Sequence, residues 1–220
     1  GGLNMSTIYA TRRETLMKEL HEQNIDLAFI TDPANVFYYS GFFSDPHERF
    51  LSLVLDRRQN AVVLFTPALD KSAAASASDV TKIVPISDEQ LPFDVVAETL
   101  DANATTIAVE KKAFNLFRFD ELRGAFPNAQ VVDIQPFTNT LRMNKSTEEI
   151  EFLQQATDII EKVLSDRIKK VKIGMTELEL TGQLELLMKK YGAVGPSFAT
   201  TVLSGEKASL PHGSPGERKF

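Results

Sequence analysis

LAFITDPANVFYYSG, residues 27–41, is the part of the sequence that indicates the fold class. Its first four residues form a short apolar run, which is typical of a strand buried on both faces. Asp32-Pro33 then places a proline at the start of a helix, and Gly41 is a residue type that commonly follows a helix end. A buried strand followed directly by a short helix is the unit from which α/β domains are built.

Strands and helices continue to alternate on both sides of this stretch, up to about residue 135. Before it, the pattern Thr11-Arg12-Arg13-Glu14 predicts a capped helix start, with Gln23-Asn24 as the stop. After it, two apolar runs joined by a polar segment predict a β-hairpin over residues 50–65. We expect further helices at 69–77, 93–100 and 115–123, and further strands at 82–86, 106–110 and 130–134. The pattern predicts an α/β domain with a mixed sheet.

The pattern changes after Pro136. Ser146-Thr147-Glu148-Glu149 is a second capping pattern, and apolar residues at helical spacing behind it predict the longest helix of the chain. Gly174 ends that helix, and Thr176-Glu177-Leu178-Glu179 begins another, which stops at Gly192. Residues 198–203 then predict a strand. We therefore divide the chain into a domain of residues 5–138 and a second domain of residues 139–220.

Composition excludes several classes of protein. Apolar residues make up 43% and charged residues 25% of the 220 residues, as in ordinary globular domains. A sum of 24 Lys and Arg against 30 Asp and Glu gives a net charge of −6, which argues against a nucleic-acid partner. The chain has no cysteine, so disulfides, zinc fingers, iron–sulfur clusters and thiol nucleophiles are excluded.

The sequence also bears on location. The longest apolar runs are about five or six residues, far short of the ~20 that a membrane-spanning helix needs, and no secretory signal pattern is present at the N-terminus. Gly1-Gly2-Leu3-Asn4 has the character of a cloning remnant, and we expect the natural start at Met5. We expect a cytoplasmic protein without a membrane partner.

Candidate functional residues are few. The three histidines are far apart, at 21, 47 and 212, and no carboxylate pair lies at ligand spacing, so no metal-binding or cofactor-binding residue is assigned in this chain. His21 at a helix end has the pattern of a surface residue. His47, in a polar loop, is interpreted as solvated, with a contact at the rim of an active site or subunit interface as the alternative. Gly205-Glu206-Lys207-Ala208-Ser209 resembles a phosphate-binding loop only faintly and is set aside.

Two further features have two interpretations each. The aromatic cluster formed by Tyr38-Tyr39 and Phe42-Phe43 around Gly41 is interpreted as core and turn, with a substrate lip or dimer contact as the alternative. His212 lies in Leu210-Pro211-His212-Gly213, where the flanking proline and glycine direct the backbone and leave the imidazole free. It is either a solvated loop residue or a group that transfers a proton or hydrogen-bonds a developing charge.

Four stretches, in this order, give the chain a family resemblance. They are LRMNKSTEEI at 141–150, GMTE at 174–177, PSF at 196–198 with Ser204-Gly205, and Pro211-His212-Gly213. Together they resemble the metallopeptidase family of Xaa-Pro dipeptidases (prolidases), aminopeptidase P and creatinase. Residues 9–135 are similar, more loosely, to that family's non-catalytic N-terminal α/β domain, with 31–42 the best stretch.

The resemblance implies a fold and an activity. The fold would be a mixed-sheet N-terminal domain followed by the start of an α+β pita-bread domain. The family's catalytic domain holds two divalent metals, often Mn or Co, with two Asp, one His and two Glu, and these ligands lie C-terminal to the position that His212 matches. We therefore expect the N-terminal portion of a homodimeric enzyme that hydrolyses the peptide bond preceding proline in small peptides, inactive by itself. His212 would contact the substrate or the tetrahedral intermediate and assist proton transfer.

A second function remains open from the sequence. A naturally short, non-catalytic homologue could serve as a dimerisation or peptide-binding module. The sequence does not decide between dipeptidase and aminopeptidase P specificity.

Overall fold

The computed structural model describes residues 7–220, and the start expected at Met5 lies outside them. The described residues form two compact units with the break between Met143 and Asn144, whereas the sequence suggested a boundary between residues 138 and 139. Within residues 7–220, no helix combines the length and the apolar character that crossing a bilayer requires.

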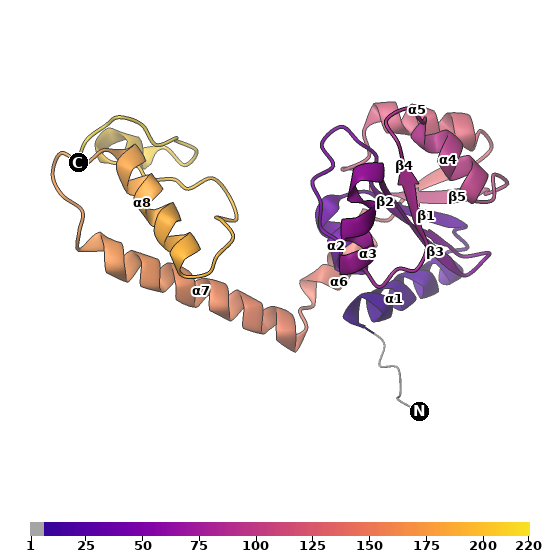
Figure 1. Ribbon diagram of the computed structural model, residues 1–220, viewed down its shortest axis with the longest axis horizontal. Helices are drawn as coiled ribbons and strands as arrows, with labels where there is room; N and C mark the ends of the chain where they lie inside the picture. The colour runs from indigo at the N-terminus through magenta and orange to yellow at the C-terminus, as the bar shows by residue number, and fades with distance from the viewer. Residues whose placement is uncertain (1–6) are drawn as a thin grey trace. The chain divides into compact units, whose positions relative to one another are not determined.

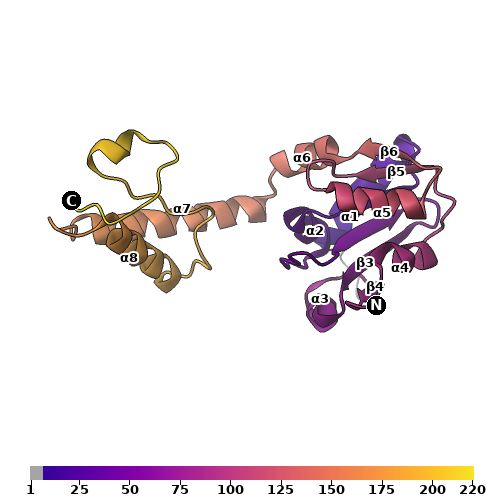
Figure 2. The same ribbon diagram turned by 90° about the horizontal axis from the view of Figure 1, so that it is seen from above.

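The first unit is a six-stranded sheet with helices on both faces (Figures 1 and 2). The strand order is β4-β3-β2-β1-β5-β6; β2 pairs antiparallel with β1 and β3, and the other pairs are parallel. This mixed sheet confirms the predicted α/β class. The strands are β1 Leu27–Ile30, β2 Ser52–Asp56, β3 Ala61–Pro67, β4 Ile83–Ile86, β5 Thr106–Val109 and β6 Gln130–Asp133. The helices are α1 Ile8–Glu22, α2 Pro33–Ser40, the 3-10 turn η1 Ala68–Asp70, α3 Lys71–Ala77, α4 Pro92–Thr99, α5 Leu116–Ala125 and α6 Gln135–Met143.

The core of this unit lies on the two faces of the sheet. Successive side chains of a strand point to opposite faces, so the fully buried strand β1 contributes to both. Leu27 and Phe29 pack with apolar residues of α4 and α5, while Ala28 and Ile30 pack with those of α1, α2, α3 and α6. A central strand covered on both faces explains why β1 is a continuous apolar run without polar alternation.

Helix α2 begins and ends at the residues that the sequence indicated. The Asp32 side chain accepts a hydrogen bond from the Ala34 backbone N–H at 2.8 Å, and Pro33 occupies the first helical position. Gly41 follows the helix with φ +77°, a left-handed conformation. A Cβ at Gly41 would also lie 2.8 Å from the Tyr9 ring and 3.0 Å from the Ala77 carbonyl oxygen, so this position requires glycine.

One helix start in this unit was predicted wrongly, and one helix was not predicted. Helix α1 begins after Thr7, whose hydroxyl caps Ala10, so Thr11 lies inside the helix and its hydroxyl donates to the Thr7 carbonyl. Helix α6 was not expected, because Pro136 was interpreted as the end of the pattern. Proline is tolerated in the first turn of a helix, where its missing N–H would have no intrahelical partner anyway.

The second unit contains the two expected helices, α7 Thr147–Ile168 and α8 Glu177–Lys190, followed by irregular backbone and the 3-10 turn η2 Gly205–Ser209. Both predicted capping boxes are present. In the first, Ser146 Oγ accepts from the Glu149 N–H at 3.2 Å and Glu149 accepts from the Ser146 N–H at 2.9 Å. In the second, the corresponding distances between Thr176 and Glu179 are 3.1 and 2.7 Å. Local capping therefore sets where both helices begin.

The predicted strand at residues 198–203 was wrong. This stretch has no regular structure, and within residues 7–220 no strand pairs with it. A strand needs a neighbour for its backbone N–H and C=O groups, so β-forming residues alone do not produce one. The backbone bridge that this unit does contain joins Thr176 to Lys219. Phe198 remains 79% exposed.

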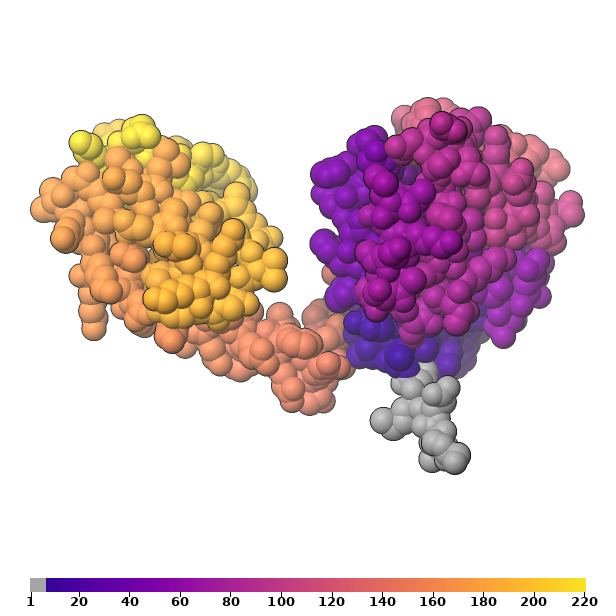
Figure 3. All heavy atoms as spheres, viewed as in Figure 1, coloured from indigo at the N-terminus to yellow at the C-terminus, as the bar shows by residue number. Residues whose placement is uncertain are grey.

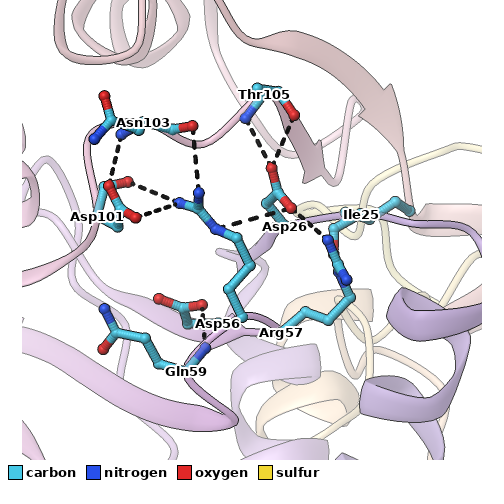
Figure 4. Close-up of polar contacts among 9 residues, drawn as sticks. Ile25, Asp26, Asp56, Arg57, Gln59, Asp101, Asn103 and Thr105 are labelled. Carbon is cyan, nitrogen blue, oxygen red and sulfur yellow. Dashed lines mark hydrogen bonds and ion pairs between the residues drawn. The ribbon is translucent and has the colours of Figure 1, made fainter.

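A buried carboxylate joins three segments of the first unit (Figure 4). Asp26 precedes β1 and is 5% exposed. It accepts hydrogen bonds from Arg57 at 2.6 Å and from the Thr105 N–H at 2.8 Å, and Arg58 of the same hairpin forms an ion pair with Asp101 at 3.0 Å. Burial alone would raise the pKa of Asp26, but the hydrogen bonds from Thr105 and Arg57 outweigh it and lower the pKa below its usual value.

We expect Asp26→Asn to destabilise the first unit by about 1.5–3 kcal/mol at pH 7, because the amide cannot replace a carboxylate that accepts charged hydrogen bonds. The folded pKa lies below the unfolded value of about 3.9, so the carboxylate stabilises the fold above that value and loses this effect as pH falls through the folded pKa. Urea unfolding at pH 7 and pH 3 measures the loss of unfolding free energy and its dependence on pH. The difference in unfolding free energy between wild type and Asp26→Asn should be smaller at pH 3 than at pH 7. An equal difference at the two pH values would contradict a stabilising role of the ionised Asp26. The exposed Asp120→Asn on α5 is the control.

Candidate functional site

His212 lies at the tip of a turn in the second unit. The Gly213 N–H donates to the Leu210 carbonyl at 3.2 Å, with Pro211 at the second position of the turn. Proline at the second position and glycine at the fourth are the residues that such turns favour. The His212 side chain is exposed, and within residues 7–220 it makes no hydrogen bond or ion pair. Its imidazole is therefore available to a ligand, and its direction depends on the backbone of the turn.

A buried carboxylate lies at the base of this turn. Glu177, the first residue of α8, has no exposed surface. Its Oε1 accepts from the Ser204 N–H at 2.8 Å and from the Ser204 hydroxyl at 3.1 Å. Its Oε2 accepts from Lys207 Nζ at 2.6 Å and from the Gly216 N–H at 3.0 Å. One side chain thus binds the segment on both sides of His212.

The charge state of Glu177 follows from these donors. The hydrogen bond from the Lys207 ammonium lowers the pKa of Glu177, and burial raises it. The N–H groups of Ser204 and Gly216 lower it further, and the resulting pKa of Glu177 is about 2. At neutral pH the carboxylate is ionised. Lys207 also donates to the Ser214 carbonyl at 2.8 Å, so its ammonium bridges α8 and the far side of the turn. Figure 3 shows the C-terminal residues, in yellow, at the surface of the second unit.

Another buried carboxylate, Glu110, lies in the first unit directly after β5. It accepts from the Thr31 N–H at 2.6 Å, from the Asp32 N–H at 2.9 Å and from the side-chain amide of Asn35. Arg142 of α6 donates to the Asn35 carbonyl oxygen at 2.8 Å. Burial raises the pKa of Glu110 despite these donors. This network joins the β1–α2 turn to the end of α6.

The other candidate residues lie apart from His212 in sequence and environment. His21 is exposed in the last turn of α1, as expected. His47 is exposed with φ +52°, on a shallow groove that Thr31 and Asn115 also line, at the carboxyl ends of β1 and β5. Both interpretations of His47 remain predictions.

The aromatic cluster divides into a buried and an exposed part. Tyr38, Tyr39 and Phe42 are buried, which supports the core interpretation for them. Phe43 is 65% exposed and contacts Phe37 edge-to-face, with ring centroids 6.2 Å apart. A binding role for this exposed part stays a prediction.

Among the described residues, 7–220, no group of three or more His, Cys, Asp and Glu side chains is placed to hold a metal ion.

Sequence reasoning missed Glu177 and Lys207. In the sequence, Glu177 stands out only as part of a helix start, and Lys207 only as part of the faint phosphate-loop pattern. A charge at either position is ordinary for a helix terminus or a surface loop. What distinguishes Glu177 and Lys207 is the hydrogen bond between their side chains. They are 30 residues apart in the sequence, so no local pattern indicates this contact.

Comparison with known families decides the relationship. Residues 12–144 match the family model described as the Creatinase/Prolidase N-terminal domain, and residues 151–220 match metallopeptidase family M24. The chain belongs to the creatinase/prolidase family. This confirms the resemblance, and the observed fold corresponds to a creatinase/prolidase N-terminal domain followed by the start of an M24 domain.

Individual relatives cover both units of this creatinase/prolidase chain. An uncharacterized peptidase of Staphylococcus aureus (strain bovine RF122 / ET3-1) is 31% identical over 210 residues, which is 96% of this chain and 58% of the relative. Prolidase from Pyrococcus furiosus superposes with a TM-score of 0.83 at 29% identity, covering 95% of this chain and 62% of that one. X-Pro aminopeptidase from Thermotoga maritima MSB8 superposes with a TM-score of 0.79 at 28% identity, covering 94% of this chain and 57% of that one. The chain thus spans less than two thirds of the length of each of these three proteins.

Proposed function

We propose that this chain is the N-terminal portion of a metal-dependent Xaa-Pro peptidase that hydrolyses the peptide bond preceding proline in small peptides. One observation carries the proposal. The superposition on a prolidase and on an X-Pro aminopeptidase extends over 94% or more of the chain, and so includes residues of both units. Residues 5–138 would form the non-catalytic domain and residues 139–220 the beginning of the catalytic domain.

His212 is the residue that we assign to the reaction. It would contact the substrate or the tetrahedral intermediate and assist proton transfer, because an imidazole can exchange a proton near neutral pH. Its exposure at the tip of an anchored turn supports this role. Two divalent metals, Mn or Co, would be held by residues further along the complete polypeptide. The enzyme would be a cytoplasmic homodimer, and the 220-residue chain alone would be inactive.

The complete reading frame of the gene provides the test. We expect the polypeptide it encodes to hydrolyse Ala-Pro or Ala-Pro-Ala in the presence of Mn²⁺ or Co²⁺, and the 220-residue chain to cleave neither. Ala-Ala and Ala-Ala-Ala are the matched controls, and comparing the two proline peptides separates dipeptidase from aminopeptidase activity. A stop codon directly after Phe220 would favour the non-catalytic homologue. Equal cleavage of peptides with and without proline would overturn the proposed specificity.

A further inference from the structure

We propose that Glu177 is a positioning residue that, together with Lys207, closes the base of the loop bearing His212 and so sets the direction of its imidazole. The catalytic meaning of this arrangement rests on the proposed function of His212. The arrangement itself, which we call the Glu177–Lys207 clasp, is a feature of this chain that can be tested without any substrate.

The clasp binds the loop at its two ends. Glu177 accepts hydrogen bonds from Ser204 and Lys207, which precede His212, and from Gly216, which follows it. Lys207 adds a direct link across the base, because its ammonium also donates to the Ser214 carbonyl. Movement of the loop away from α8 would break several of these bonds and leave a buried carboxylate without its donors. Such a loss is costly because a buried charge needs its partners.

Helix α8 is a firm support for the carboxylate. The capping box of Thr176 and Glu179 fixes the start of the helix at Glu177, directly after the N-cap Thr176. The Glu177 N–H also donates to the Arg218 carbonyl at 3.0 Å, and Thr176 bridges to Lys219. Backbone and side chain at the start of α8 therefore hold the same C-terminal segment, which Figure 1 shows beside α8. The positive end of the helix dipole further favours an ionised carboxylate at this place.

Close packing restricts the loop further. Gly205 has φ +53°, and a Cβ there would lie 2.0 Å from the Arg218 guanidinium. A Cβ at Gly213, next to His212, would lie 2.9 Å from the Leu203 side chain. The backbone thus lies close to neighbouring side chains at Gly205 and at Gly213, before and after His212.

The direction of the His212 ring depends on the backbone of its turn. Its imidazole makes no hydrogen bond within residues 7–220, so no side chain of these residues orients the ring. Proton transfer needs the donor or acceptor within hydrogen-bond reach of the reacting atom, so displacement of the turn by about 1 Å would reduce the rate. The bonds of the clasp to Ser204, Lys207 and Gly216 oppose this displacement.

The first experiment compares Glu177→Gln with Glu185→Gln in the 220-residue chain. Glu185 lies on the same helix and makes no hydrogen bond or ion pair within residues 7–220, so it is a matched control. In Glu177→Gln the new amide group adds a donor where four donors already meet, so at least one bond is lost. We expect amide hydrogen exchange at 204–216 to accelerate by about tenfold or more, and the ¹³C–¹H signal of His212 to shift, with exchange in α7 unchanged.

Lys207→Met provides a second variant in case Glu177→Gln does not fold. It removes the link to Ser214 but leaves the backbone donors of Ser204 and Gly216 on Glu177. We expect faster exchange at 208–216 and a shifted His212 signal, with Lys207→Arg restoring most of the protection. Unchanged exchange and an unchanged His212 signal in Lys207→Met would overturn the clasp. Equal acceleration in α7 and in the loop would assign Glu177 and Lys207 to general stability and also overturn it.

A third measurement uses the polypeptide encoded by the complete reading frame. If it hydrolyses Ala-Pro or Ala-Pro-Ala, Lys207→Met should lower kcat by about tenfold or more with little change in KM, because the turn is displaced while other substrate contacts remain. A normal kcat would overturn the positioning role. Absence of hydrolysis by the wild-type polypeptide would contradict the proposed function instead, and the exchange measurements would still decide whether the clasp exists.

Discussion

Replacement of His212 with glutamine is expected to lower kcat/KM for Ala-Pro or Ala-Pro-Ala by about 10²–10⁴-fold in the polypeptide encoded by the complete reading frame. This is the usual contribution of a side chain that transfers a proton in the transition state. Glutamine keeps a polar side chain of similar reach but does not titrate near neutral pH. Because His212 is exposed and makes no hydrogen bond within residues 7–220, folding should be unaffected, and steady-state kinetics isolates the chemical role.

His21→Gln is the matched control, because His21 is also exposed but lies in the last turn of α1. We expect it to leave kcat and KM within about twofold of wild type, consistent with a surface substitution. A His212→Gln variant with wild-type kcat/KM would remove His212 from the reaction. In that case the exposed turn would be a solvated loop, the alternative that the sequence left open.

Replacement of Phe29 with alanine is expected to have the largest effect on stability, a loss of about 3–5 kcal/mol in the unfolding free energy of the first unit. Phe29 has no exposed surface and lies on the central strand β1. Its ring stacks on Phe93 at 5.9 Å and meets Phe126 edge-on at 6.4 Å, which ties the sheet to α4 and α5. The substitution leaves a cavity that neighbouring strands cannot close. Hydrogen exchange of the β1 and β5 amides measures the loss.

Phe117→Ala on α5 removes the same side chain from a position that is 68% exposed. We expect a change within about 0.5 kcal/mol there. Amides of α7 provide an internal reference, since they belong to the other compact unit. Similar losses of unfolding free energy in Phe29→Ala and Phe117→Ala would contradict the placement of Phe29 in the core of the first unit.

Most helices and strands of the two units could be predicted because their signals are local. The apolar run at 27–30, the proline of α2 and the capping residues Ser146 and Thr176 each act within a few residues of their place in the chain. The family resemblance likewise depended on short motifs in order, and the family matches confirm it.

Other predictions were wrong where contacts between residues distant in the sequence determine the local structure. Thr7 and Thr11 offer the same hydroxyl, but Thr7 also hydrogen-bonds Asp79 on another segment, which favours the earlier helix start. Residues 198–203 have the composition of a strand, but pairing depends on a neighbour that their own sequence does not specify.

The sequence by itself determined the order and type of most elements, the two capped helices and the turn that presents His212, because helix caps and turns are set by neighbouring residues. Tertiary structure alone decided what supports that turn. Glu177 meets its three partners across 27, 30 and 39 residues of chain. No periodicity or motif spans such separations; burial of the carboxylate requires donors, and only the folded backbone brings Ser204, Lys207 and Gly216 to one point.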